Sequence, residues 1–246
     1  VNYRVMTRLS VNVNKIATLR NARGENRPDV LKMALLIESL GAHGITVHPR
    51  PDERHIKKSD VLMLKKHVRV EFNVEGYPSD DFIDLIHEVR PHQVTLVPDP
   101  PHVLPSYAGF ILKDDSEFVT HAIVELKSCG VRISLFIDPQ DFINRDVAVI
   151  KATGSDRIEL YTKAFADNPQ CAHTLAMYQN VAPRVHALGL GINAGHDLDL
   201  ANLGILLEAI PFITEVSIGH ALICDALELG MPETMRRYLE ILKKNR

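Results

Sequence analysis

Hydrophobic positions along the chain follow two alternating patterns. Short apolar runs rich in β-branched residues are each followed by a longer segment in which apolar residues return at helical spacing. The eight runs that we predict as strands are residues 9–13, 44–48, 70–75, 93–98, 131–138, 157–162, 191–196 and 214–220. The chain is therefore predicted to alternate between strand and helix along its length.

The segments between these runs carry helix signals. Val119, Ala122, Ile123 and Leu126 have the spacing of an apolar helix stripe. The predicted helix starts are Pro28, Ser59, and Ser79 with Asp80, and the predicted helix ends are Gly41, Gly130 and Gly189. The apolar faces of these helices are therefore predicted to pack on the sheet.

The number of strand-helix units predicts the fold class. Eight units in 246 residues amount to about 31 residues each, close to the unit size of a (β/α)₈ barrel. We therefore predict an α/β protein, a single (β/α)₈ TIM-barrel domain over residues 1–246. The alternative is an open doubly wound sheet, which would carry a glycine-rich phosphate turn after its first strand. The chain has NKIATLRNARG there, without a GxGxxG motif.

Composition and charge exclude several classes of function. The formal net charge is -3 and the basic residues are scattered, which argues against a nucleic-acid surface. No stretch approaches the roughly 18 apolar residues that a membrane helix needs. The three cysteines lie far apart without a CxxC pair, as in proteins of a reducing compartment. We therefore expect a cytoplasmic protein without nucleic-acid or membrane partners.

Polar side chains gather where the predicted strands end. In a (β/α)₈ barrel the carboxyl ends of all strands meet at one opening, which carries the chemistry. The polar residues at these ends are Asn12, Asn14, His48, Arg50, Asn73, Glu75, Glu159, His196 and His220. Carboxylates and histidines that converge on one opening are typical of acid-base catalysis, because burial and neighbouring charges tune their pKa values toward neutrality.

Two other interpretations of these polar residues stay open. Polar residues at strand ends also serve as caps and turn formers. A metal site is the second alternative, although the chain has neither an HxH nor an HExxH motif.

Two late glycines indicate phosphate binding. Gly195 and Gly219 each stand at the end of a predicted strand and ahead of a helix, where free backbone N–H groups attract an anion. Arg23 and Arg50 are predicted to hold further phosphate oxygens. The alternative for both arginines is a solvated surface loop.

The segment 98–110 is the longest irregular stretch of the chain. Its four prolines exclude a helix or a central strand. Because it follows the fourth predicted strand, we predict a lid over the catalytic opening. A surface insertion without a role is the alternative.

Several motifs, in their order and spacing, closely resemble one family. They are NVNKIATLRNARG, GITVHPRPDERHI, FNVEGYP, PHQVTLVP, SLFID, RIELYT, GINAGHD and SIGHALI. The family is pyridoxine 5′-phosphate synthase, the ring-closing enzyme of vitamin B6 biosynthesis, and the resemblance extends from Leu9 to about Leu229. TLRNARG, GITVHxRxDxRHI and NAGH are too long and unusual for a chance match.

The resemblance implies an activity and its catalytic residues. Such an enzyme condenses 1-deoxy-D-xylulose 5-phosphate with 3-amino-2-oxopropyl phosphate and releases pyridoxine 5′-phosphate, phosphate and water. It needs no metal and no organic cofactor, and it forms a homo-oligomer. The implied catalytic residues are His48 and Glu75 as general bases, His196 as proton donor, and Glu159 as the carboxylate that stabilises the transition state.

The resemblance also implies which residues bind the two phosphates. They are Asn12, Arg23, Gly219 and His220 for the aminoketone phosphate, and Arg50 with His55 for the sugar phosphate.

The chain departs from the common family pattern in three places within these binding positions. Asn14 and Lys15 stand where many members have Asp-His, and we predict that Lys15 supplies charge there. Pro105 replaces a threonine and leaves Ser106 as the nearest hydroxyl. Asp197 replaces a glycine after the catalytic histidine. Because a carboxylate beside a phosphate is unfavourable, a helix N-cap is favoured over a ligand as the role of Asp197.

Two other functions stay open at this point. One is a Schiff-base aldolase barrel, for which Lys163 or Lys15 would be the nucleophile. The other is a non-catalytic barrel that binds phosphosugars, which the presence of both Glu75 and His48 disfavours.

Overall fold

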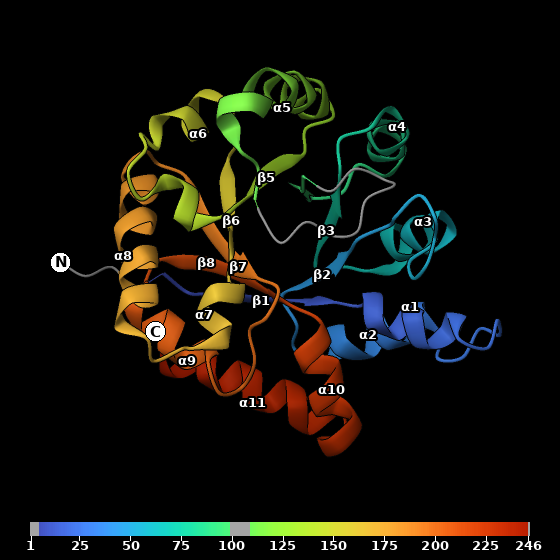
Figure 1. The fold of residues 1–246 in the computed structure, drawn as a ribbon. Helices are drawn as coiled ribbons and strands as arrows, with labels where there is room; N and C mark the ends of the chain where they lie inside the picture. The colour runs from blue at the N-terminus through green and yellow to red at the C-terminus, as the bar shows by residue number, and fades with distance from the viewer. Residues whose placement is uncertain (1–4, 99–108, 246) are drawn as a thin grey trace.

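The computed structural model describes residues 5–98 and 109–245, and it leaves the side chains of residues 113–115 undescribed. Eight parallel strands form a closed barrel, in the order β1 to β8 (Figure 1). They are β1 (Arg8–Asn12), β2 (Gly44–Val47), β3 (Glu71–Gly76), β4 (Gln93–Leu96), β5 (Arg132–Ile137), β6 (Arg157–Tyr161), β7 (Gly191–Gly195) and β8 (Ile213–Ile218). Because β1 pairs with β8, the predicted (β/α)₈ barrel is confirmed and the open sheet is wrong.

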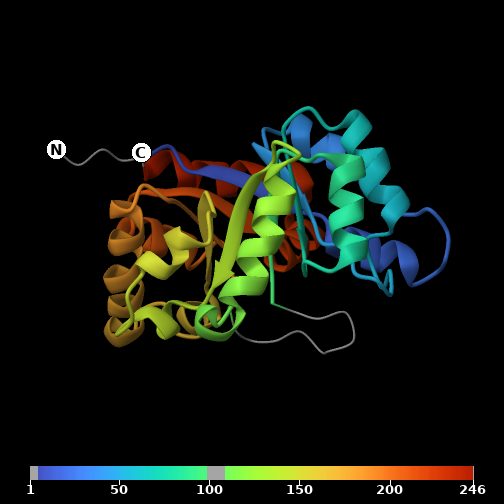
Figure 2. The same cartoon turned by 90° about the horizontal axis from the view of Figure 1, so that it is seen from above.

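Helices surround the barrel (Figures 1 and 2). Those in the described part of the chain are α1 (Asn14–Asn21), α2 (Val30–Ser39), α3 (Lys58–His67), α4 (Asp80–Val89), α5 (Leu112–Lys127), the 3₁₀ helix η1 (Pro139–Phe142), α6 (Ala148–Ala152), α7 (Lys163–Asp167), α8 (Ala172–Ala187), α9 (Leu203–Ala209), α10 (His220–Leu229) and α11 (Met231–Lys244). Every connection between successive strands includes at least one helix, as crossovers between parallel strands require.

The predicted element boundaries are largely confirmed. All eight strands are present, with ends displaced by at most two residues. Ser79 caps α4, since its hydroxyl accepts a hydrogen bond from the Phe82 N–H. The three predicted stops each follow a helix at a positive φ that favours glycine, namely Gly41 at 99°, Gly130 at 74° and Gly189 at 76°.

Three helix predictions need correction. Pro28 does not open α2, because Asp29 is the N-cap and its carboxylate accepts the Lys32 N–H. Ser59 is the second residue of α3 rather than its start, and the carboxylate of Asp60 accepts the N–H of Lys57 at the beginning of that helix. Helix α1 was not predicted. Its buried face includes Arg20, so apolar residues do not recur along it at helical spacing.

The strands place polar residues inside the barrel and apolar residues outside it. Side chains alternate between the two faces of a strand, and apolar residues such as Val11 and Val47 pack against the helices in the core. Buried polar groups form a chain across neighbouring strands. Ser10 and Thr46 share a hydrogen bond of 2.7 Å, and Asn73 bonds to Thr46 at 3.3 Å. The barrel interior is therefore hydrogen-bonded and polar.

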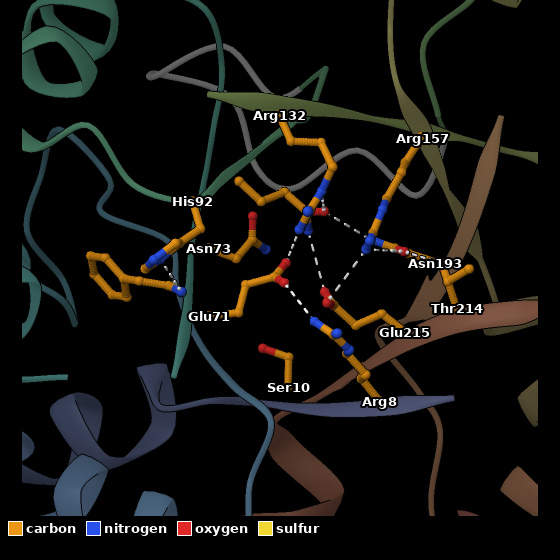
Figure 3. A network of polar contacts seen from close by, with 12 residues as sticks. Arg8, Ser10, Glu71, Asn73, His92, Arg132, Arg157, Asn193, Thr214 and Glu215 are labelled. Atoms are coloured by element: carbon orange, nitrogen blue, oxygen red, sulfur yellow. Dashed lines mark hydrogen bonds and ion pairs between the residues drawn. The ribbon is translucent and has the colours of Figure 1, made fainter. Parts of the chain in front are cut away.

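A charged network fills the amino-terminal end of this interior (Figure 3). This floor network consists of Arg8, Glu71, Gln93, Arg132, Arg157 and Glu215. All but Glu215 are the first residues of their strands. Arg132 pairs with Glu71, and Arg157 Nη1 lies 3.5 Å from Glu215 Oε2. Gln93 joins the two pairs, because its amide donates to Glu215 at 3.2 Å and accepts from Arg132 at 3.0 Å.

Glu215 is the most deeply buried carboxylate of the floor network, with 3% of its side chain exposed. Burial, followed by the nearby charge of Glu71, raises the pKa of Glu215 to about 7, although Arg157 and Arg132 act in the opposite direction. A buried carboxylate whose partner is removed is strongly destabilising. The stability of the barrel floor therefore depends on the guanidinium groups.

We expect Arg157→Met to lower the free energy of unfolding at pH 8 by about 3 to 5 kcal/mol, because Glu215 loses a partner while ionised. The loss is expected to be smaller at pH 5, where Glu215 is protonated. Urea unfolding at both pH values measures the difference. The double variant with Glu215→Gln is expected to recover most of the loss, and independent, additive effects of the two changes would contradict this account.

Candidate active site

A cavity of about 430 Å³ opens at the carboxyl ends of the strands, opposite the floor network. Its lining includes these predicted site residues: Asn12, Asn14, Lys15, His48, Arg50, His55, Glu75, Glu159, His196, Asp197, Gly219 and His220. Arg23 is not part of this lining and lies exposed beyond the end of α1. Ser106 and most of the predicted lid, 98–110, lie outside the described residues.

Glu75 and His48 form the centre of the cavity. His48 Nδ1 lies 3.9 Å from Glu75 Oε2, and both side chains are nearly buried. Burial raises the pKa of Glu75 to about 7. Burial, with the positive charge of Arg50 next in size, lowers the pKa of His48 to about 3. His48 is therefore a neutral imidazole at pH 7, and its contact with Glu75 joins two proton-accepting groups rather than an ion pair.

Two asparagines at the β1-α1 junction hold this pair in place. Asn12 Nδ2 donates to Glu75 Oε2 at 3.3 Å, and Asn12 Oδ1 accepts the N–H of Asn14 at 3.0 Å. Asn14, the first residue of α1, accepts the backbone N–H of His48 at 2.9 Å through its own side chain. The two residues therefore fix the backbone of β2 and the carboxylate of β3 relative to each other.

Glu159, on β6, is buried beside the Glu75-His48 pair. Among the described residues, its Oε2 has no hydrogen-bond partner. Burial raises the pKa of Glu159 well above its ordinary value, and the charges of Glu75 and Glu215 add to this effect. Its neutral, protonated form is therefore favoured by its surroundings. Gly195 provides the space, because a Cβ there would lie 2.7 Å from Glu159 Oε1.

His196 and Asp197 follow directly after β7. His196 Nδ1 lies 2.5 Å from Asp197 Oδ2, and the ring of Tyr161 meets the His196 ring edge-on at 5.7 Å. The predicted N-cap role of Asp197 is wrong, since α9 begins only at Leu203. For the same reason Gly195 does not directly precede a helix.

Another part of the cavity rim is positively charged. Lys15 and Arg50 lie near His55, and burial together with these two cations lowers the pKa of His55 to about 4. Gly219 is the N-cap of α10, so this glycine stands directly before a helix as the sequence predicted. A Cβ at Gly219 would lie 3.1 Å from Asn12 Cβ. This rim offers cations and a helix amino terminus, which favour anions.

Several residues that shape the cavity were not predicted from the sequence. Val97, Pro98, Phe136, Tyr161 and Ser217 complete its lining. Strand parity is a signal for one of them, because Tyr161 lies two residues after Glu159 and so faces the same side of β6. The rings of Phe136 and Tyr161 lie 5.6 Å apart and form an apolar wall.

Arg20 and Asn21, at the end of α1, anchor the loop that carries Arg50 and His55. Arg20 binds both carboxylate oxygens of Asp60, at 2.5 and 2.8 Å, and donates to the carbonyl of His55. Asn21 Nδ2 donates to the same carbonyl at 2.8 Å. The TLRNARG motif was the available signal, but the residue predicted from it to act at the site was Arg23 rather than buried Arg20 or partly buried Asn21.

The described residues contain neither a metal-binding cluster nor a membrane-spanning helix. In residues 5–98 and 109–245, no group of three or more His, Cys, Asp or Glu side chains is arranged to hold a metal ion. Within the same part of the chain, the helices are too short or too polar to cross a membrane.

Comparison with known proteins identifies the family. The family model described as pyridoxal phosphate biosynthesis protein PdxJ matches residues 9–244. The chain belongs to this family. Pyridoxine 5′-phosphate synthase of Porphyromonas gingivalis is 54% identical, covering 96% of this chain and 99% of the relative. The Cytophaga hutchinsonii protein of the same name is 52% identical, covering 97% of this chain and all of the relative.

Solved structures with little sequence identity share the fold. Phosphoribosyl anthranilate isomerase from Thermotoga maritima has a TM-score of 0.63 at 11% identity, over 97% of this chain and 100% of that one. Thiamine phosphate pyrophosphorylase from Pyrococcus furiosus has a TM-score of 0.61 at 12% identity, over 99% of both chains. At such identities the likeness concerns the barrel alone.

Family membership confirms the predicted resemblance and the predicted kind of activity. The chain is an enzyme, a ring-closing synthase of pyridoxine biosynthesis. Nothing in the comparisons supports the aldolase or the non-catalytic barrel.

The raised pKa of Glu75 predicts a pH-dependent cost to stability. Its folded-state pKa of about 7 exceeds the ordinary 4.5, so the cost is absent at low pH, grows above the unfolded pKa and is complete above pH 7. We expect Glu75→Gln to raise the free energy of unfolding at pH 8 by up to about 3 kcal/mol, with a much smaller gain at pH 5. Urea unfolding tests this, with exposed Glu208→Gln as control. Equal gains at both pH values would contradict it.

Proposed function

We propose that this pyridoxine 5′-phosphate synthase condenses 1-deoxy-D-xylulose 5-phosphate with 3-amino-2-oxopropyl phosphate. The observation that carries the proposal is the Glu75-His48 pair, a carboxylate with its pKa near 7 beside a neutral imidazole. Two proton acceptors that operate at neutral pH, buried together in a cavity with a cationic rim, suit proton transfers on phosphorylated substrates.

The proposed reaction needs only acids and bases. The amine of one substrate attacks the ketone of the other to form an imine. Tautomerisation, loss of phosphate and water, ring closure and aromatisation then each move a proton at carbon or oxygen. Glu75 and His48 remove these protons, and His196 delivers them.

Glu159 is proposed to respond to charge on the imine nitrogen. Burial raises the pKa of this carboxyl group, and a cation that develops beside it lowers the pKa again and favours the ionised form. The attraction is then present in the charged transition state and absent in the neutral ground state. Such differential stabilisation is what accelerates a reaction.

The cationic rim is proposed to hold the substrate phosphates. Arg50, His55 and Lys15 surround the proposed site of the sugar phosphate. Asn12 and the amino terminus of α10 at Gly219 and His220 surround that of the aminoketone phosphate. Arg23 lies too exposed in this structure to support its predicted contact.

The Schiff-base alternative lacks a suitable lysine at the centre of the cavity. Lys163 is partly exposed, is ion-paired with Asp167 and is not part of the cavity lining. Lys15 belongs to the lining but is exposed. Neither lysine is therefore desolvated, and desolvation is one of the two ways in which a lysine becomes nucleophilic near neutral pH, the other being a neighbouring cation.

The organisation and location of the enzyme complete the proposal. We propose one barrel domain over residues 1–246, a homo-oligomer and a cytoplasmic location. The apolar face of α11 is buried inside the subunit through residues such as Met235 and Tyr238, and so does not offer a surface for the oligomer contact. An oligomer contact therefore has to use other surfaces.

Mixing both substrates with the purified enzyme tests the proposal, with the product detected by its absorbance and mass. We expect Glu75→Gln to lower kcat by about 10²-fold or more while KM changes little, because the variant keeps the shape and loses the base. Exposed Glu208→Gln is the matched control. Near wild-type turnover by Glu75→Gln would remove Glu75 from the mechanism.

Trapping with borohydride separates this mechanism from an enzyme-linked imine. In the proposed reaction the imine joins the two substrates, so enzyme treated with 1-deoxy-D-xylulose 5-phosphate and borohydride keeps its intact mass. The aldolase alternative instead predicts a stable mass increase equal to the reduced sugar phosphate. Loss of that increase in Lys15→Met or Lys163→Met would identify the nucleophile.

A further inference from the structure

The geometry points to Asp197 as a positioning residue for the proton donor. Its carboxylate accepts the Nδ1–H of His196, so that His196 exchanges its catalytic proton with the substrate through Nε2. The role of His196 in this inference rests on the proposed function, whereas the contact with Asp197 does not. Asp197 thereby takes a role in the acid-base machinery in place of the predicted helix N-cap.

The contact is short and its backbone is fixed. His196 Nδ1 lies 2.5 Å from Asp197 Oδ2. His196 has a φ of 89°, in the left-handed region that residues with a Cβ rarely adopt. Buried Asn202 donates its side-chain amide to the carbonyl of Asp197 at 3.1 Å and accepts the N–H of Asp199. A side-chain clamp therefore holds the segment that presents the pair.

The contact has two chemical consequences. A carboxylate that accepts from Nδ1–H fixes the tautomer of the neutral imidazole, which leaves Nε2 as the nitrogen that faces other partners. The same negative charge favours the imidazolium and so keeps the proton donor loaded at neutral pH. An orienting acid beside a catalytic histidine serves these purposes on unrelated folds.

Other charged and titratable groups face the pair from five elements, including Tyr178 of α8, whose pKa the charge of Asp197 helps to raise. Tyr161 of β6 contacts the His196 ring, and Glu75 of β3 interacts with its charge. Lys163 of α7 and His220 of α10 act on Asp197. Burial alone would raise the pKa of Asp197, but the hydrogen bond from His196 and these positive charges hold it below its ordinary value. Asp197 is therefore ionised whenever His196 titrates.

A negative charge at this position also argues against a phosphate contact. A carboxylate and a phosphate repel each other unless a cation separates them. Asp197 directs its Oδ2 to His196, which gives the carboxylate a partner inside the site.

Imidazole ¹⁵N NMR of the substrate-free enzyme tests the contact without any assay of function. The His196 signals are assigned by their loss in His196→Gln. We expect the neutral form of His196 to carry its proton on Nδ1, and its titration midpoint to fall by about one pH unit in Asp197→Asn. Asp197→Glu, which keeps a carboxylate, is expected to restore part of the shift. Because each spectrum also reports folding, an unfolded variant is recognised directly.

Asp199→Asn is the matched control. It removes the same charge from the same segment, and its side chain can still accept the N–H groups of Ala201 and Asn202 that Asp199 accepts. We expect the His196 midpoint to stay unchanged in this variant. A proton on Nε2 in the neutral form, an unchanged midpoint in Asp197→Asn, or an equal fall in Asp199→Asn would each overturn the inference.

The pH profile of kcat adds a functional readout. An acid is active while protonated, so activity falls as pH rises through its pKa. We expect this alkaline limb to move to lower pH in Asp197→Asn by the same amount as the NMR midpoint, with kcat affected more than KM. An unmoved limb despite a lower NMR midpoint would overturn the catalytic part of the inference. Absence of turnover in the wild-type enzyme would instead refute the proposed function, while the NMR titration would still decide the contact.

Discussion

Desolvation inside a closed barrel is the constraint on which the site depends. Eight strands that pair all the way round leave no open edge, so a polar side chain that points inward is removed from water. Glu75, Glu159 and Glu215 all lie inside, and burial is the largest cause of the raised pKa of each. Burial thereby brings the pKa of Glu75 and of Glu215 to about 7 and raises that of Glu159.

The two ends of the barrel treat buried charge differently. At the floor, guanidinium groups accompany Glu71 and Glu215, which stabilises the ionised forms. At the mouth, Glu159 has a buried oxygen with no hydrogen-bond partner in the described part of the chain. The first arrangement supports the fold, whereas the second costs stability and retains reactivity. Proteins commonly keep an unfavourable group at a functional site and compensate for its cost in stability elsewhere in the fold.

Features that depend on the spacing of residues along a strand or helix could be predicted from the sequence. Features that depend on which side chains form hydrogen bonds with one another could not. The ends of the predicted strands located Glu75 and Glu159 at the mouth, because the carboxyl ends of all strands of a (β/α)₈ barrel meet at one opening. Asp197 was predicted to cap the helix after β7, but α9 begins only at Leu203. The segment between them is held instead by the hydrogen bond from the Asn202 side chain to the carbonyl of Asp197. Arg20 was overlooked for Arg23, because burial of a charged residue depends on a partner 40 positions away. Such distant pairings leave no periodic trace in a single sequence.

The anchoring of one loop by α1 has a consequence for substrate choice. Arg20 and Asn21 tie the loop with Arg50 to α1, and α1 also contacts α10, where Gly219 packs on Asn12. The two proposed phosphate sites are therefore attached to one rigid body and stand at a set separation. The distance between the two proposed phosphate sites is then a criterion by which the enzyme selects its substrates. A pair of substrates whose phosphates lie too close together or too far apart is therefore expected to bind poorly, even where its charge and shape fit.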